Sequence, residues 1–142
     1  MSWNLAGFSG QVCAAMDARR HQIYNARFQV DGQCPRRLTP DRAISLDDLV
    51  QELAGTQTPQ LVVGDGAQLC YDALTAAGIP AVLAPPNLRM QSAWGVARQA
   101  LALAQAGQTL SPAQLVPVYH RLSQAERERL EREQAAQTPH PQ

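Results

Sequence analysis

The chain has 142 residues, of which 45% are hydrophobic, and this is typical of one globular domain with a buried core. Twelve arginines balance twelve acidic residues without any lysine, and the zero net charge argues against a general attraction to nucleic acid or membrane. Three widely spaced cysteines match neither a disulfide framework nor a zinc motif. No run approaches the roughly 18 apolar residues of a membrane span, so we expect a cytoplasmic protein with reduced thiols.

The first part of the chain predicts three antiparallel strands. Residues 11–17 and 22–30 are two runs with the apolar character of buried strands, separated by a short polar segment. This is the pattern of a β-hairpin. Asp31-Gly32 is a turn signal, and the extended run 34–38 would then add a third strand.

A helix and a βαβ unit follow. Ser45-Leu46-Asp47-Asp48 is a capping box that predicts a helix from this point to Gly55. The apolar run 61–63, the helical segment 67–77 and the apolar run 81–84 then alternate, with glycines between them. Strand, helix and strand in this order predict two parallel neighbours in one sheet.

The last part of the chain is predicted to be mainly helical. Residues 91–106 have a broad apolar face that includes Trp94, and we expect this face to pack in a core or against another lobe. The segment 110–119 is extended and contains two prolines. A charged helix is expected at 125–134, and a disordered tail at 135–142.

This order of elements predicts an α/β fold of the ribonuclease-H-like type. Its pattern is three antiparallel strands and then parallel βαβ strands, flanked by helices. The same unit forms each half of proteins in the actin-like ATPase superfamily. Such halves normally occur in pairs, and this chain has the length for one.

Several segments are specific enough to indicate a family. They are MDARRHQIYNARF at 16–28, LVVGDGA at 61–67, WGVA at 94–97 and LVPVYHR at 115–121. Over residues 4–133 the chain resembles the C-terminal lobe of the bacterial TsaB (YeaZ) family, which carries the older label of a glycoprotease family. The first strand and the glycine-rich loop of that family's N-terminal lobe have no counterpart here. The resemblance implies that 1–10 is the end of a helix from a missing lobe and that 11–134 is the C-terminal lobe.

The resemblance implies a scaffold subunit and not an enzyme. TsaB takes part in making N6-threonylcarbamoyladenosine at position 37 of tRNA, together with the catalytic paralogue TsaD and the ATPase TsaE. The expected partners are therefore TsaD and TsaE, with tRNA reached indirectly and no membrane contact. No cofactor or metal is expected in this chain, and ATP or ADP would bind only at an interface of the complex. The alternative is a peptidase-like or nucleotide-hydrolysing enzyme.

The tip of the hairpin is the first candidate site. Asp17, Arg19 and Arg20 could approach a nucleotide phosphate or an RNA backbone, since arginines donate charge-assisted hydrogen bonds to phosphate. The alternative is a solvated turn that Asp17 stabilises through its own backbone. His21 lies beside these residues, but no second histidine has metal-ligand spacing.

The segment Gly64-Asp65-Gly66 is the second candidate site. It resembles a phosphate loop because a glycine-rich turn before a helix can present backbone N–H groups to an anion. Gly-x-Gly alone is a weak signal, and Asp65 as the N-cap of the next helix explains it equally well. Neither segment supplies a nucleophile with a base, so no catalytic set is predicted.

Three further expectations concern the surface. Cys13 and Cys70 should be buried, whereas Cys34 should be exposed and reactive. The lobe face would be apolar and should cause self-association of the chain. RNA binding by Arg19, Arg20, Arg36 and Arg37 is a third function class, which the zero net charge disfavours.

Overall fold

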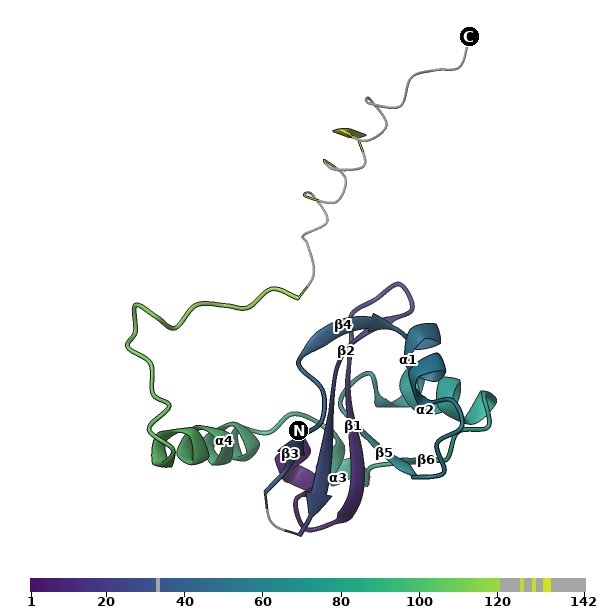
Figure 1. The fold of residues 1–142 in the computed structure, drawn as a ribbon, viewed down its shortest axis with the longest axis horizontal. Coiled ribbons are helices and arrows are strands. Elements are labelled where there is room, and N and C mark those ends of the chain that lie inside the picture. Colours follow the sequence, from purple (N-terminus) through teal and green to yellow (C-terminus); the bar gives the residue numbers. More distant parts are fainter. Residues whose placement is uncertain (33, 121–125, 127–128, 130–131, 134–142) are drawn as a thin grey trace.

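The structure is a computed structural model that describes residues 1–32, 34–120, 126, 129 and 132–133. Figure 1 shows one sheet with helices on both sides. The elements are η1 (Ser2–Leu5), β1 (Ser9–Asp17), β2 (Gln22–Asp31), β3 (Arg36–Arg37), β4 (Arg42–Ser45), α1 (Leu46–Leu53), β5 (Gln60–Val63), α2 (Ala67–Ala76), β6 (Ala81–Leu83), α3 (Pro86–Arg89) and α4 (Ala93–Gln105). Within the described residues, no helix is long and apolar enough to cross a membrane.

The sheet mixes antiparallel and parallel strands in the order β3-β2-β1-β5-β6, and β4 also pairs with β2. The hairpin of β1 and β2 is antiparallel from Ser9↔Asp31 to Asp17↔Ile23. The strands β1, β5 and β6 are parallel neighbours. The predicted hairpin and the predicted parallel βαβ unit are therefore confirmed, and the mixed α/β class with them.

The third strand of the predicted meander differs from the expectation. Only Arg36–Arg37 of the run 34–38 forms a strand, and the longer partner of β2 is β4 at Arg42–Ser45. The strand β4 was not predicted from the sequence, because a run of four residues is too short to show a periodicity. Both strands lie along the same edge of β2, so the chain still completes an antiparallel three-stranded unit.

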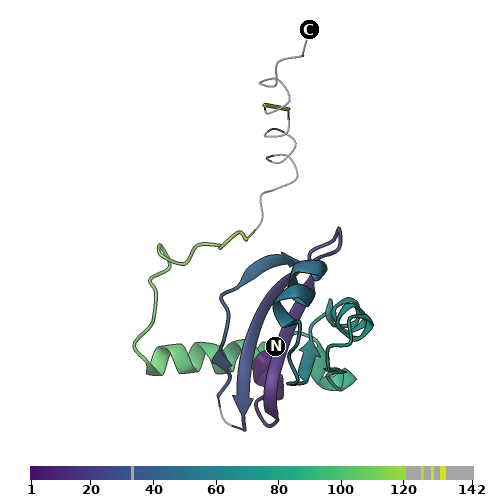
Figure 2. The same cartoon turned by 45° about the vertical axis from the view of Figure 1, so that its right-hand side comes forward.

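One face of the sheet is covered by α1 and α2, and we call it the closed face. Figure 2 shows these two helices together on one side of the strands. Ser45 caps α1 as predicted, because its hydroxyl oxygen accepts a hydrogen bond from Asp48 N at 3.0 Å. The buried core beneath the helices consists of Cys13, Ala15, Ile23, Leu46, Leu49, Leu53, Val62, Ala67, Cys70, Leu74 and Ile79.

The opposite face of the sheet is covered only in part by the chain, and we call it the open face. The short helices η1 and α3 cover its lower end, where Leu5 is fully buried and Leu88 packs nearby. This second core contains Leu5, Val12, Ala14, Val30, Val63 and Ala84. Next to this core on the open face are the side chains of Met16, Tyr24 and Phe28, which line a groove.

Helix α4 begins on the open side and leads away from the sheet (Figures 1 and 2). Ser92 caps it through a hydrogen bond from Gly95 N of 3.1 Å. Of the residues of α4, all of which are described, only Gly95 is buried. Trp94 is 56% exposed, so the expectation that it packs in the core is wrong for this chain, and packing against another lobe stays a prediction.

The described residues that follow α4 form no regular helix or strand as far as His120, and this segment is exposed. The predicted charged helix at 125–134 falls largely outside the described residues, although Glu126, Arg129, Arg132 and Glu133 are helical. The predicted tail at 135–142 lies wholly outside them.

Candidate functional site

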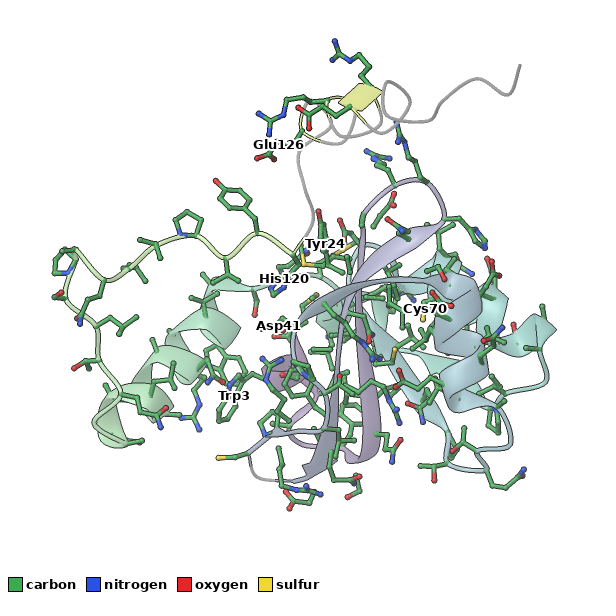
Figure 3. The ribbon with its side chains drawn as sticks, turned by 45° about the horizontal axis from the view of Figure 1, so that its top comes forward. Trp3, Tyr24, Asp41, Cys70, His120 and Glu126 are labelled. Atoms are coloured by element: carbon green, nitrogen blue, oxygen red, sulfur yellow. The ribbon has the colours of Figure 1, made fainter. Side chains whose placement is uncertain are left out.

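A groove of about 810 Å³ lies on the open face. Its floor is the sheet, with Tyr24 and Phe28, and its wall is α4, with Val96 and Leu103. The segment around His120 closes the remaining side. Figure 3 labels Trp3, Tyr24, Asp41 and His120, which all line this groove, whereas Cys70 lies on α2 on the closed side.

The charged groups at the groove are already paired within the chain. Arg37 forms an ion pair of 2.8 Å with Asp41, and its guanidinium lies 4.8 Å from the centre of the Phe28 ring. Arg42 forms an ion pair of 2.7 Å with Glu52. Recognition in this groove would therefore depend mainly on apolar contact, because its arginines are already neutralised.

Exposed apolar side chains also lie on α4 and on the segment that follows it. We refer to the following large apolar side chains, all of them exposed to solvent, together as the apolar strip: Trp94, Val96, Leu101, Leu103, Leu110, Leu115, Val116, Val118 and Tyr119. Val96 is 70% exposed and Tyr119 is 84% exposed. Of these side chains, Val96, Leu103, Val118 and Tyr119 line the groove, and exposed apolar side chains beside a groove are typical of a protein-interaction site.

Contacts with η1 fix the start of α4 against the domain. Trp3 Nε1 donates a hydrogen bond of 2.8 Å to Gln99 Oε1. The Arg98 guanidinium lies 5.1 Å from the Trp3 ring centre and 5.9 Å from that of Trp94. Ser92 Oγ donates to Asn4 Oδ1 at 2.7 Å. These contacts were not predictable from the sequence, because the residues that form them lie 88 to 96 positions apart in the chain.

The hairpin tip is a tight turn with an unusual backbone. Arg19, Arg20 and His21 have φ angles of 64°, 54° and 60°, in the left-handed region that residues other than glycine rarely adopt. Asp17 Oδ1 accepts a 2.7 Å hydrogen bond from Arg19 N, and Asp17 Oδ2 forms an ion pair of 3.3 Å with Arg19. Asp17 therefore stabilises the turn as its alternative interpretation expected, and phosphate or RNA contact at this tip stays a prediction.

The predicted glycine turn packs directly against the end of β1. A Cβ added at Gly64 would lie 2.0 Å from Ala15 O, and one at Gly66 would lie 2.8 Å from Asp17 N. Gly64 N donates to Arg89 O at 2.8 Å, and Gly66 N donates to Ala15 O at 3.1 Å. These two N–H groups therefore serve contacts within the chain, and the glycines are explained by close approach of backbones.

The structure brings the two predicted segments together, since Asp17 N donates to Asp65 Oδ1 at 3.3 Å. The expectation that Asp65 caps the following helix is wrong, because the N-cap of α2 is Gly66 and no side chain caps it. Asp65 bonds the hairpin instead. His21 also joins an acidic neighbour, with Nε2 3.6 Å from Asp47 Oδ1.

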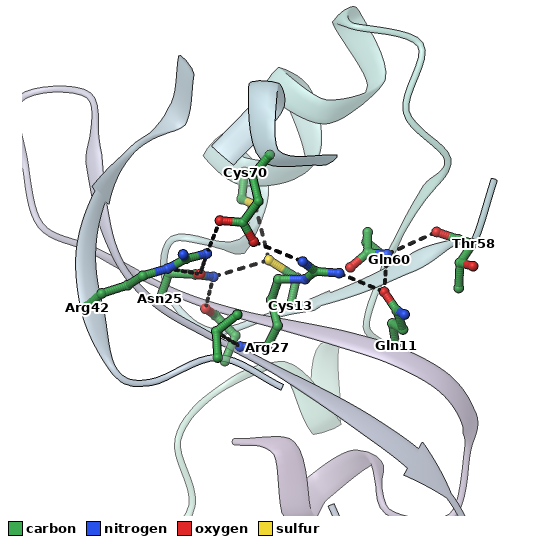
Figure 4. A network of polar contacts seen from close by, with 11 residues as sticks. Gln11, Cys13, Asn25, Arg27, Arg42, Thr58, Gln60 and Cys70 are labelled. Carbon is green, nitrogen blue, oxygen red and sulfur yellow. Dashed lines mark hydrogen bonds and ion pairs between the residues drawn. The ribbon is translucent and has the colours of Figure 1, made fainter. Parts of the chain in front are cut away.

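A polar network beneath α1 and α2 was not predicted from the sequence (Figure 4). Glu52 of α1 binds Arg27 at 2.9 Å and Arg42 at 2.7 Å. Arg42 Nε donates to Asn25 Oδ1 at 3.2 Å, and Asn25 Nδ2 approaches Cys13 Sγ at 3.4 Å. The signal that could have indicated it is the polar pair Asn25 and Arg27 at alternate positions of β2, which point to the same face as the buried Ile23.

The network ends in two buried thiols, and all three cysteines are free. The Sγ atoms of Cys13 and Cys70 lie 3.9 Å apart. The hydrogen bond from Cys70 lowers the pKa of the Cys13 thiol, and Asn25 and the two arginines add to this effect. The same hydrogen bond and burial raise the pKa of the Cys70 thiol. Both are buried and Cys34 is exposed, as the sequence analysis predicted.

Comparisons with known proteins bear on the fold. No protein-family model matches the chain, and no curated protein matches it. A solved structure from Pseudomonas aeruginosa, of a protein with similarity to the peptidase YeaZ, is 20% identical with a TM-score of 0.56, over 80% of this chain and 50% of that one. YeaZ from Pseudomonas aeruginosa is 19% identical with a TM-score of 0.55, over 78% of this chain and 50% of that one. The chain therefore has a YeaZ-like α/β fold and spans about half the length of these neighbours.

Proposed function

We propose that this chain is a non-catalytic scaffold that acts through protein–protein contacts in the synthesis of N6-threonylcarbamoyladenosine at position 37 of tRNA. The observation that supports the proposal most is the apolar strip beside the open-face groove, on a YeaZ-like fold. The proposed partners are the catalytic paralogue TsaD and the ATPase TsaE, in the cytoplasm. Transfer RNA would be reached through these partners, and ATP or ADP would bind only where subunits meet.

A protein fits the groove better than a nucleic acid does. A surface for phosphates needs arginines that are free to pair with them. Arg37 and Arg42 at the groove are paired with Asp41 and Glu52. The same surface offers Val96, Leu103 and other apolar side chains, which bind the apolar face of a helix or strand.

A scaffold role also agrees with the contacts of the two candidate phosphate sites, the hairpin tip and the turn Gly64-Asp65-Gly66, which bind other parts of the chain. Asp17 bonds the turn of its own hairpin, and Asp65 bonds the same hairpin. Gly64 N and Gly66 N donate to carbonyl groups of the chain. These groups stabilise the junction of β1, β5 and α2, which gives the residues a structural role.

The proposal is tested by size-exclusion chromatography with light scattering. The chain is run alone at about 100 μM, mixed with TsaD of the same organism, and compared with a full-length YeaZ protein mixed in the same way. We expect co-elution with TsaD and, without TsaD, some self-association through the apolar strip. A chain that stays monomeric and does not shift TsaD, while the full-length protein does, would contradict both expectations.

Variants locate the contact. Val96→Asp and Val118→Asp place a charge in the apolar strip, at side chains that are at least 70% exposed. Leu69→Asp is the matched control, because Leu69 is an exposed apolar side chain of α2 on the closed side. We expect the first two variants to weaken association about tenfold or more and the control to retain it. If all three variants lose association equally, the substitutions act on folding and not on this surface.

A further inference from the structure

Cys13 and Cys70 form a pair of buried thiols for which the proposed function has no role. They come from β1 and α2, 57 positions apart in the chain, and their Sγ atoms lie 3.9 Å apart. Both side chains are fully buried. A disulfide has an S–S distance of about 2.0 Å, so the two sulfur atoms need to approach by roughly 2 Å in total.

The close approach of α2 to β1 explains why two short side chains meet here. A Cβ at Gly66 would lie 2.8 Å from Asp17 N, so only glycine allows the start of α2 to lie this near the strand. Cys70 is one helical turn further along, and its N–H donates to Gly66 O at 3.1 Å. Cys70 therefore faces the strand across the same narrow gap, directly towards Cys13.

The surroundings make the two thiols unequal. Asn25 Nδ2 lies 3.4 Å from Cys13 Sγ, and the charges of Arg27 and Arg42 also favour its thiolate. The hydrogen bond with Cys13 and burial raise the pKa of the Cys70 thiol, and either sulfur atom can be the donor of that bond. The thiolate is the nucleophilic form of cysteine, and the nucleophile of this pair is therefore Cys13.

We propose that Cys13 and Cys70 are a reversible dithiol–disulfide pair, oxidised by a peroxide, that links β1 to α2. The Cys13 thiolate attacks one peroxide oxygen, the O–O bond breaks, and the leaving oxygen departs as water after it takes up a proton. Cys13 is then a sulfenic acid. Cys70 loses its proton and attacks that sulfur, the S–O bond breaks, and a second water leaves. Two thiols and one hydrogen peroxide give one disulfide and two waters, and a dithiol reductant reverses the change.

This proposal does not depend on the proposed function, because it concerns the closed side of the sheet and not the groove. The thiols are buried, so the oxidant must be small or α2 must open locally. The pair should therefore react more slowly than the exposed Cys34. That order distinguishes a buried pair from a surface thiol.

The test is peptide mapping of the intact chain after treatment with hydrogen peroxide. Cleavage after arginine places Cys13 in peptide 1–19, Cys34 in peptide 28–36 and Cys70 in peptide 43–89, so each pairing has its own mass. We expect peptides 1–19 and 43–89 to become linked and to separate again with dithiothreitol. This link should exceed intramolecular links to Cys34 by about tenfold, because the fold holds the two sulfurs together. The same treatment in urea should give a mixture in which Cys34 takes part.

Two results would overturn the proposal. One is a native chain in which Cys13 and Cys70 stay free thiols even after peroxide has oxidised Cys34 completely. The other is a native chain with the same mixture of links as the urea-unfolded chain. The Cys34→Ser variant is a control that removes competing links, since that side chain is exposed. In Cys70→Ser, a sulfenic acid trapped at Cys13 by dimedone would identify Cys13 as the nucleophile. If dimedone instead traps a sulfenic acid at Cys70 in Cys13→Ser, and none at Cys13 in Cys70→Ser, Cys70 is the nucleophile.

Discussion

The two faces of the sheet differ in how completely the chain covers them. On the closed face, α1 and α2 bury a continuous core, and Glu52 of α1 joins the polar network with Arg27 and Arg42. On the open face, η1 and α3 cover one end, while the groove and the apolar strip stay exposed. The difference indicates that the closed face supplies most of the stability of the domain, whereas the open face is available for a partner.

The largest expected effect tests the junction that positions α2 on the closed face. In Gly64→Ala, the new Cβ would lie 2.0 Å from Ala15 O, at a φ of +118° that disfavours any side chain. We expect the free energy of unfolding to fall by about 4–5 kcal/mol, which could prevent folding. The matched control is Gly78→Ala, where φ is +73° but no atom lies within 4 Å of the new Cβ. Gly78→Ala should lower the free energy of unfolding, measured by chemical denaturation, by about 1–2 kcal/mol. An equal decrease for both variants would mean that the close approach to Ala15 O does not explain the effect at Gly64.

The next effect compares one leucine from each side directly. Leu74 of α2 is fully buried on the closed face, whereas Leu101 of α4 is 49% exposed on the open side. Leu74→Ala should lower the free energy of unfolding by about 2–5 kcal/mol. Leu101→Ala should change it by less than about 0.5 kcal/mol. Urea denaturation measures both, and a large loss from Leu101→Ala would mean that α4 packs on the domain in solution.

The sequence predicted the closed face well because its elements carry local signals. Ser45 and its capping box located α1, and the glycines around α2 located the βαβ unit. The strand β4 was missed because its pairing with β2 is set by contacts and not by its own four residues. For Trp94 the sequence left two alternatives, the core or another lobe, and only the core is excluded, since an apolar helical face does not reveal whether its partner belongs to the same chain.

The candidate site was predictable only in part. The sequence identified the hairpin tip and the glycine turn separately, but not that Asp17 would meet Asp65 or that Gly66 would cap α2. Long-range approach of this kind depends on the order of strands in the sheet. The groove was not predicted at all, because its residues come from β1, β2, α4 and the segment near His120. No local pattern joins such distant positions.

A smaller effect compares the ion pairs of the two faces. Glu52 holds Arg27 and Arg42 on the closed side, and the Arg27 side chain is only 14% exposed. Glu52→Gln should lower the free energy of unfolding by about 1–3 kcal/mol, because it leaves a buried guanidinium without its carboxylate. Asp41→Asn is the control at the groove, since it breaks the more exposed pair with Arg37 and should cost less than about 1 kcal/mol. Thermal unfolding measures the stability of both variants. A lower Tm for Asp41→Asn than for Glu52→Gln would contradict this comparison.

The smallest effect concerns the hairpin tip, where Arg19, Arg20 and His21 have a strained backbone. Arg20 has a φ of 54°, which costs a residue with a side chain about 1 kcal/mol or more. Arg20→Gly should remove this strain and, after the added entropy of glycine in the unfolded chain, raise the free energy of unfolding by about 0.5 kcal/mol. Arg36→Gly in β3 is the control and should lower it by about 0.5–1 kcal/mol, because glycine weakens a strand.

The sign of the Arg20→Gly effect decides how the tip is interpreted. A stabilising effect would mean that the native arginine is kept at the cost of stability, which is the usual condition of residues held for a binding role. Binding of tRNA or TsaD by the same variant would then be the measurement that locates that role. A destabilising effect would mean that Arg20 makes favourable contacts in the folded chain. The tip would then be a structural turn, and the open face would remain as the single candidate surface among the residues that the structure describes.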